Sequence, residues 1–156
     1  MSVAAFAGKR EIMDMISPLG AVYQAGTLSG NPVAMAAGIA SLSKIYASDG
    51  LYERLGELAR RLTDGLCAIA QRRGIALQTA CAGSMFGYFF ADEEVRDYDG
   101  ALRADTARFA KFHGEMIKRG VFLAPSQFET GFICASMDEA QIDFALNAAD
   151  EAMAAL

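Results

Sequence analysis

The sequence contains one histidine, no tryptophan and only three cysteines among its 156 residues. His113 is the only histidine, so the sequence gives little support to a Ser-His-Asp catalytic triad and to a histidine-rich metal site. We interpret His113 as a partly exposed residue of a helix rather than as a catalytic group. Cys67, Cys81 and Cys134 are far apart and show no C-x-x-C spacing, so we predict no metal site and reduced thiols in a cytoplasmic protein.

Basic charge is also scarce, with 14 lysine and arginine residues against 19 acidic ones and a net charge of -5. No basic run is longer than a pair, which argues against nucleic acid and acidic membrane surfaces as partners. The longest uncharged run, residues 15–43, is interrupted by Pro18, Gln24, Asn31 and Pro32, so it does not predict a membrane-spanning helix. The N-terminus lacks the charged lead and the longer apolar core of a signal peptide.

Apolar residues are plentiful at 53% of the chain, enough for a core of its own. From Leu51 onward the pattern predicts the order helix, β, β, helix, β, β, helix, which implies an α/β unit with a small sheet covered by helices on one side. The predicted helices are residues 51–73, 101–119 and 139–156, and the predicted strands are residues 75–81, 85–91, 121–125 and 131–136. A polar, acidic connection is expected over residues 92–100.

The first 45 or so residues do not fit this unit well, and they look like the end of a larger domain. A short amphipathic helix is predicted over residues 9–16. A second helix is predicted over residues 32–47, with Asn31 as its N-cap and Pro32 in its first position. This helix is apolar nearly all the way round, so either an ordinary core position or a subunit interface explains it.

The loop between these two helices, "QAGTLSGNP", combines glycines with hydroxyl and amide side chains. Gly26 lets the backbone approach a ligand, Thr27 offers a hydroxyl, and Gly30 permits a tight turn. The following helix is expected to direct free amides and its positive dipole end at the loop, as in phosphate sites. The same residue types also gather in turns for purely conformational reasons, and local chemistry leaves both interpretations open.

A second loop carries Glu129 between two predicted strands, next to Phe128 and near Phe132. Its carboxylate is either a solvent-facing turn residue or a group directed into a cleft. Ser126 is expected to start the turn rather than to attack a substrate.

Together these segments carry a resemblance to a known family. "FAGKREIMDMISPLGAVYQAGTLSGNPVAMAAGIA" and "GVFLAPSQFETGF" closely resemble the C-terminal part of the glutamate-1-semialdehyde 2,1-aminomutases. These are fold type I pyridoxal phosphate enzymes of the class III aminotransferase group. The likeness runs over essentially the whole chain, and "VYQAGTLSGNP" with "APSQFE" separates the aminomutases from their class III cousins.

The resemblance implies a function and a set of site residues. Members of the family use pyridoxal 5'-phosphate and pyridoxamine 5'-phosphate to convert glutamate-1-semialdehyde to 5-aminolevulinate, a precursor of tetrapyrroles. Gly26 and Thr27 would contact the cofactor phosphate of the neighbouring subunit in a homodimer, and Glu129 would line the substrate pocket. Residues 1–47 would be a remnant of the large cofactor domain that includes an interface helix, and residues 48–156 would be the C-terminal small domain.

The chemistry also needs a lysine that forms a Schiff base with the cofactor aldehyde. In the family that lysine precedes the segment that here begins "VAAFAGK", so we expect this chain to be a fragment without a catalytic residue and inactive alone. The lysines at positions 9, 44, 111 and 118 do not match its sequence context. Met137 stands where the family usually has histidine, which leaves the substrate preference open. The alternatives are a fragment of a class III aminotransferase or amino-acid racemase, and a non-catalytic association module.

Overall fold

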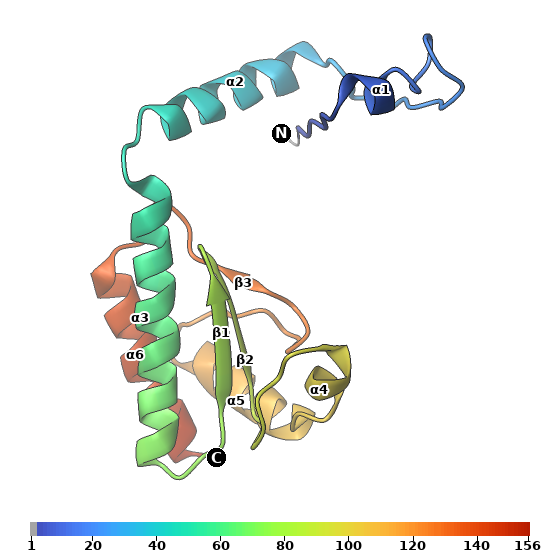
Figure 1. The fold of residues 1–156 in the computed structure, drawn as a ribbon. Coiled ribbons are helices and arrows are strands. Elements are labelled where there is room, and N and C mark those ends of the chain that lie inside the picture. The colour runs from blue at the N-terminus through green and yellow to red at the C-terminus, as the bar shows by residue number, and fades with distance from the viewer. Residues whose placement is uncertain (1–2) are drawn as a thin grey trace. The chain divides into compact units, whose positions relative to one another are not determined.

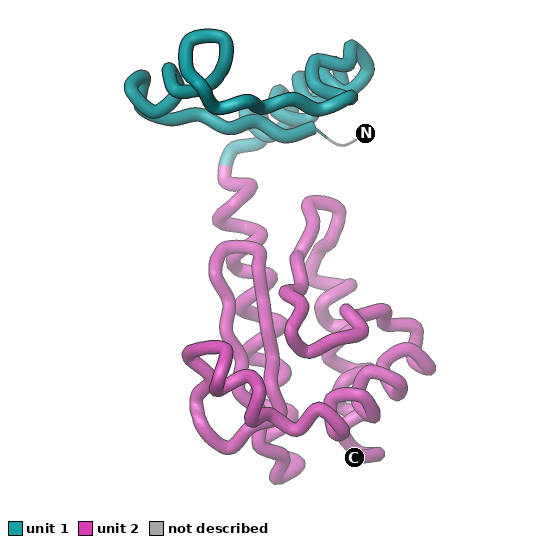
Figure 2. The backbone as a smooth tube through the Cα atoms, turned by 90° about the vertical axis from the view of Figure 1, so that its right-hand side faces the viewer, with its two compact units in different colours: residues 1–49 teal, residues 50–156 magenta. Residues whose placement is uncertain are grey.

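The computed structural model describes residues 3–156. The chain forms two compact units, one ending at Asp49 and one beginning at Gly50 (Figure 2). Among the described residues, no helix is long and apolar enough to cross a membrane.

The first unit contains two helices, α1 (Arg10–Met13) and α2 (Pro32–Tyr46) (Figure 1). The helix predicted over residues 9–16 is therefore much shorter than expected. The residues at the end of the predicted helix pair with the segment around Val22. The amide of Val22 donates to the carbonyl of Met15 at 2.9 Å, and the amide of Ser17 donates to the carbonyl of Val22 at 2.9 Å. A pairing with a later segment has replaced the last turn of the helix.

Helix α2 starts where the sequence predicts. The side chain of Asn31 accepts hydrogen bonds from the amides of Val33 at 3.1 Å and Ala34 at 3.2 Å, and Pro32 occupies the first helical position. Within the described chain only Ala34 and Gly38 of this helix are buried. Its exposed apolar side chains include Val33, Ile39, Leu42 and Tyr46.

The second unit is a three-stranded antiparallel sheet with helices. Its elements are α3 (Leu51–Arg72), β1 (Gln78–Ala82), β2 (Met85–Phe89), α4 (Tyr98–Leu102), α5 (Thr106–Lys118), β3 (Gly131–Phe132) and α6 (Glu139–Ala154). The sheet order is β1-β2-β3, and the β1–β2 hairpin pairs Thr79 with Tyr88. In this turn Gly83 has a φ of 57°, a left-handed conformation that glycine adopts without steric strain.

Two details of the helices in this unit differ from the prediction. The acidic connection contains the short helix α4, whose first turn is capped by Asp97 through the amide of Gly100 at 2.7 Å. The next helix begins at Thr106 rather than at Ala101, because Asp105 is its N-cap. The amide of Asp105 donates to the carbonyl of Phe90 at 2.8 Å. The predicted helix over residues 101–119 is thus divided in two.

The predicted strand over residues 121–125 is wrong, and the one over residues 131–136 shortens to β3. Only Gly131 and Phe132 pair with β2, so the segment before them is left outside the sheet. That segment is held by helix α5 instead, because Val121 donates to Met116 at 3.0 Å and the carbonyl of Leu123 lies 3.1 Å from Nε2 of His113.

Helices α3 and α5 cover the same face of the sheet. The thiol of Cys67 on α3 lies 3.1 Å from the hydroxyl of Thr79 on β1. Thr79 pairs with Tyr88, and directly paired residues of antiparallel strands point to the same face. Tyr88 in turn contacts Phe109 and Phe112 of α5, with ring centroids 5.7 and 5.8 Å apart. The prediction of a sheet covered by helices on one side is confirmed.

Helix α6 packs along α3 (Figure 1). Exposed ion pairs connect the two helices, with Arg61 2.7 Å from Asp143 and Arg73 2.8 Å from Asp150. The aspartate at position 138 begins α6 with a capping box, as the sequence predicts for its N-cap.

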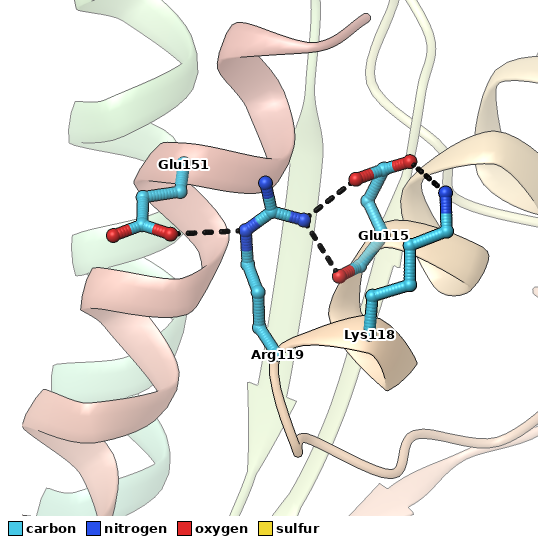
Figure 3. A network of polar contacts seen from close by, with 4 residues as sticks. All are labelled: Glu115, Lys118, Arg119 and Glu151. Carbon is cyan, nitrogen blue, oxygen red and sulfur yellow. Dashed lines mark hydrogen bonds and ion pairs between the residues drawn. The ribbon is translucent and has the colours of Figure 1, made fainter.

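A polar network ties the end of α5 to α6 (Figure 3). Glu115 accepts from Lys118 at 2.6 Å and from Arg119 at 2.6 Å, and Arg119 also donates to Glu151 at 3.1 Å. The hydrogen bond from Lys118, which has the larger effect, and the one from Arg119 lower the pKa of Glu115 from its ordinary value of 4.5 to about 2. The folded state therefore favours the charged form of this carboxylate more than the unfolded state does.

We expect Glu115→Gln to reduce the acid sensitivity of folding. A carboxylate with a lowered folded pKa contributes stability above its unfolded pKa, and this contribution is lost as the pH falls from about 4.5 to about 2. The variant should be less stable than wild type at neutral pH and should approach it toward pH 2. Urea unfolding across this range measures the difference, with Glu53→Gln on the exposed face of α3 as control. A constant difference between wild type and variant at every pH contradicts the prediction.

Candidate functional site

The loop before α2 is built from two successive tight turns. The amide of Ser29 donates to Gly26 at 2.9 Å, and the amide of Asn31 donates to Leu28 at 3.1 Å. Gly30 has a φ of 71°, so this position requires a left-handed conformation. A Cβ at Gly26 would lie 3.1 Å from the hydroxyl oxygen of Ser29, tighter than ordinary contact. Gly30 therefore has a conformational reason to be glycine, whereas at Gly26 only the rotatable hydroxyl of Ser29 would be close to an added side chain.

The first turn of α2 does not supply the free amides that the sequence suggests. Pro32 has no N–H, the amides of Val33 and Ala34 donate to the side chain of Asn31, and the amide of Met35 donates to the carbonyl of Asn31. The expectation of open helix amides is wrong, because the predicted N-cap already satisfies them.

The loop itself still offers donors. Within residues 3–156, no hydrogen bond engages the amides of Gly26, Thr27 and Gly30 or the hydroxyl of Thr27, and all three residues are exposed. Backbone amides and a hydroxyl are donors suited to phosphate oxygens. The residues present thus fit a phosphate group through the loop and not through the helix.

A hollow of about 590 Å³ adjoins this loop inside the first unit. Its walls include Phe6, Gln24, Gly26, Ser29 and Met35. The loop donors therefore lie beside a space with both apolar and polar walls.

Glu129 lies in the second unit, on the loop between α5 and β3. Its amide donates to the carbonyl of Ser126 at 3.1 Å, and the hydroxyl of Ser126 accepts from the amide of Phe128 at 3.2 Å. Ser126 therefore starts the turn, as predicted. Glu129 is exposed and also borders a small cavity with Phe86 and Tyr88, so neither of the two interpretations from sequence excludes the other.

The neighbouring Gln127 is a residue that the sequence analysis missed. It is only 5% exposed, and its Nε2 donates to the carbonyl of Ala101 at 3.2 Å. Its Oε1 is buried without a hydrogen-bond partner. A glutamine in a turn between two strand-like segments gives no sequence signal for burial, since glutamine is usually exposed.

Close approach of β3 to β2 fixes the end of this loop. A Cβ at Gly131 would lie 2.6 Å from Cε1 and Cε2 of Phe86 and closer still to Cζ. The buried ring of Phe86 cannot withdraw without disturbing the core. Only glycine at position 131 lets β3 pack this closely against the ring of Phe86 on β2.

We expect Gly131→Ala to destabilise the second unit by about 1–3 kcal/mol, the usual cost of overpacking a core. Gly114→Ala on α5 is the matched control, because a Cβ there meets nothing within 4 Å and alanine favours helix. Chemical unfolding of both variants measures the difference. Equal stability of the two variants would show that β3 can move away from Phe86.

The other candidates have structural roles. His113 stacks on Phe109 at 6.1 Å and contacts the carbonyl of Leu123, and its intermediate exposure agrees with the predicted partly exposed helix residue. Among the described residues no cluster of three potential metal ligands occurs. The chain has four lysines, all of them exposed: Lys9, Lys44, Lys111 and Lys118.

Met137 packs against the hydrophobic core. Its carbonyl accepts from Arg54 at 2.9 Å, and its amide donates to Cys134 at 3.0 Å. The side chain at this position contributes to packing in this chain.

The predicted site residues fall into two groups. Gly26 and Thr27 lie together in the first unit, and Glu129 lies in the second.

Comparison with known proteins gives a consistent set of relatives. The sequence model of the class-III aminotransferases matches residues 1–137. A curated protein from Campylobacter hominis, glutamate-1-semialdehyde 2,1-aminomutase, is 67% identical over 151 residues, which are 97% of this chain and 34% of that protein. The chain spans about a third of the length of the curated relatives it matches.

Solved structures share the fold. An omega-transaminase from Sphaerobacter thermophilus matches with a TM-score of 0.78 at 22% identity, over 94% of this chain and 34% of that one. A variant glutamate-1-semialdehyde-aminomutase from Pseudomonas aeruginosa PAO1, in complex with PMP, matches with a TM-score of 0.72 at 20% identity, over 88% and 31% of the two chains. These likenesses confirm the predicted α/β fold class.

Proposed function

Because this chain belongs to the class III aminotransferase family, we propose that it forms the C-terminal part of a glutamate-1-semialdehyde 2,1-aminomutase. The whole enzyme converts glutamate-1-semialdehyde to 5-aminolevulinate, in the cytoplasm and in the biosynthesis of tetrapyrroles. The observation that carries the proposal is the 67% identity to the Campylobacter hominis protein over 151 residues.

The cofactor of the whole enzyme is pyridoxal 5'-phosphate or pyridoxamine 5'-phosphate. When bound, it supplies the carbonyl or amine through which an amino group leaves one carbon of the substrate and enters another. Gly26 and Thr27 bind its phosphate, with the loop amides and the Thr27 hydroxyl as donors. The unengaged donors and the exposed position of these two residues support this role.

The phosphate belongs to the cofactor of a second subunit, so the active enzyme is a homodimer. Residues 1–47 form part of the large cofactor domain, with α2 at the subunit interface, and residues 48–156 form the small domain. The exposed apolar side chains on α2 support this arrangement, because an exposed apolar surface on a protein marks an interaction site.

Glu129 lines the substrate pocket and helps to separate the mutase reaction from ordinary transamination. An exposed carboxylate beside aromatic rings distinguishes substrates by their charge and orients an amino group. The lysine that binds the cofactor covalently is contributed by the part of the enzyme outside this chain. None of the four lysines of this chain takes that role, so the chain contributes no catalytic residue.

A chimeric enzyme tests the proposal. The matching third of the Campylobacter hominis aminomutase is replaced by this chain, and the product is assayed for cofactor absorbance and for 5-aminolevulinate formation. We expect a dimer that retains cofactor and converts glutamate-1-semialdehyde. The chain alone is expected to show neither property.

A chimera that folds, dimerises and holds the cofactor but does not convert the substrate contradicts the proposed reaction. Transamination of common amino donors in the same assay would then identify an aminotransferase. A chimera that fails to dimerise, beside an unmodified relative that succeeds, would contradict the interface role of α2.

A further inference from the structure

Gln127 is buried with one half of its amide unsatisfied. Nε2 donates to the carbonyl of Ala101 at 3.2 Å, whereas Oε1 is buried without a partner. Reversing the amide would place two acceptors, Oε1 and the Ala101 carbonyl, against each other, so the observed orientation is the favourable one. A buried acceptor without a partner is strongly unfavourable, and native proteins usually satisfy such a group with ordered water.

A small, partly enclosed space for such a water exists at the same place. A cavity of about 20 Å³ is lined by Gln127 together with Tyr88 and Glu129. One water molecule needs about 10–15 Å³ of such volume and two or more polar partners. Tyr88 is 8% exposed, and burial raises the pKa of its hydroxyl, so this group keeps its proton and can donate as well as accept.

We propose that one internal water molecule occupies this cavity and donates to Oε1 of Gln127, and that Gln127 is thereby a positioning residue for Glu129. The water satisfies its remaining hydrogen bonds with polar groups of the residues around the cavity, among which are Tyr88, Ser126 and Glu129. Only the role of Glu129 as a substrate-pocket residue rests on the proposed function. The water site and the restraint of the loop stand on this geometry alone.

The contacts of Gln127 explain how the restraint acts. Its hydrogen bond to Ala101 attaches the loop to α4, and Phe128 contacts Tyr98 of the same helix at a ring separation of 6.2 Å. Glu129 follows Phe128, in a turn closed by two hydrogen bonds to Ser126, one from the amide of Glu129 to its carbonyl and one from the amide of Phe128 to its hydroxyl. Two contacts with α4, one to a backbone carbonyl and one to a side chain, together with one water therefore fix a loop that has little secondary structure of its own.

Water contacts in the wild-type chain provide the first test. In nuclear Overhauser spectra of the 156-residue chain, we expect a long-lived water near the Hα protons of Gly131, which line the cavity and do not exchange. The signal should vanish in Gln127→Met, which keeps the side-chain length and removes both polar groups. It should remain in Gln78→Met, where a half-buried glutamine elsewhere also donates to backbone carbonyls. A dry cavity in wild type, or a water that persists in Gln127→Met, overturns the proposal.

Amide hydrogen exchange provides the second test. We expect the amide of Glu129 to exchange about tenfold faster in Gln127→Met than in wild type, the effect of about one buried hydrogen bond. Gln78→Met should leave this rate unchanged. An unchanged rate in Gln127→Met shows that Gln127 does not restrain Glu129 and overturns the positioning role.

Gln127→Glu separates the polar role of this residue from simple filling of space. A protonated carboxyl group can donate to Ala101 and accept from the water as glutamine does, whereas the ionised form cannot donate. After correction for intrinsic exchange chemistry, protection of the Glu129 amide in this variant should recover on acidification. No such recovery is expected in Gln127→Met, and equal behaviour of the two variants overturns the proposal. Since these measurements need no cofactor or substrate, a failure of the aminomutase assignment would leave their outcome unchanged.

Discussion

Replacing Phe112 by alanine is expected to lower the free energy of unfolding of the second unit by about 3–5 kcal/mol, the cost of removing a large buried side chain. Phe112 is 0% exposed and makes edge contacts with Tyr88 and Phe90 at ring separations of 5.8 and 5.5 Å. Its removal leaves a cavity between α5 and the sheet. Since whole domains are stable by only about 5–15 kcal/mol, this one change removes much of the margin.

Urea unfolding followed by circular dichroism measures the loss. Phe122→Ala is the matched control, because Phe122 is 84% exposed and its removal creates no internal cavity. We expect this control to change the stability by less than about 0.5 kcal/mol. A loss at Phe112 as small as that at Phe122 would mean that the core around α5 collapses to fill the space.

Replacing Thr27 by valine is expected to weaken retention of the cofactor about 10- to 100-fold in the chimeric enzyme. A hydroxyl that donates to a charged phosphate contributes about 1.5–3 kcal/mol, and valine has nearly the same shape without the donor. Thr27 makes no hydrogen bond within the described chain, so its loss should leave the fold intact. Equilibrium dialysis or the cofactor absorbance band measures the retention.

Serine at position 27 is the control for this prediction. Thr27→Ser keeps the hydroxyl and should keep most of the affinity. If valine and serine bind the cofactor equally well, the hydroxyl has no contact with the phosphate. If both variants lose affinity equally, the hydroxyl and the methyl group of Thr27 contribute equally and retention does not depend on the hydroxyl alone.

Much of the second unit could be predicted because its local signals are strong. The apolar stripe of α3 and the hairpin turn at Gly83 each depend on residues that are close in sequence, and the structure keeps both. The strand predicted at residues 121–125 failed for a different reason. Its apolar pattern suits a strand, yet β2 pairs with the later residues Gly131 and Phe132. Which of two segments reaches a sheet edge depends on tertiary packing, which no local pattern contains.

The candidate site shows the same division. The sequence predicts Asn31 as the N-cap of α2, and the side chain of this cap occupies the amides of Val33 and Ala34, which are then not available to a ligand. The buried state of Gln127 depends on Ala101, which lies 26 residues earlier in the chain. A contact of that kind is visible only in three dimensions, and it is the reason that sequence reasoning identified Glu129 and missed its neighbour.

The pairing of Asn31 with Pro32 has a consequence for chemical ageing. Asparagine deamidates when the backbone nitrogen of the following residue attacks the side-chain amide and closes a five-membered ring. The nitrogen of Pro32 is already part of a ring and has no hydrogen to lose. The residue that orders the start of α2 is thereby protected from slow conversion to aspartate, and the loop beside it keeps its shape and charge over the lifetime of the protein.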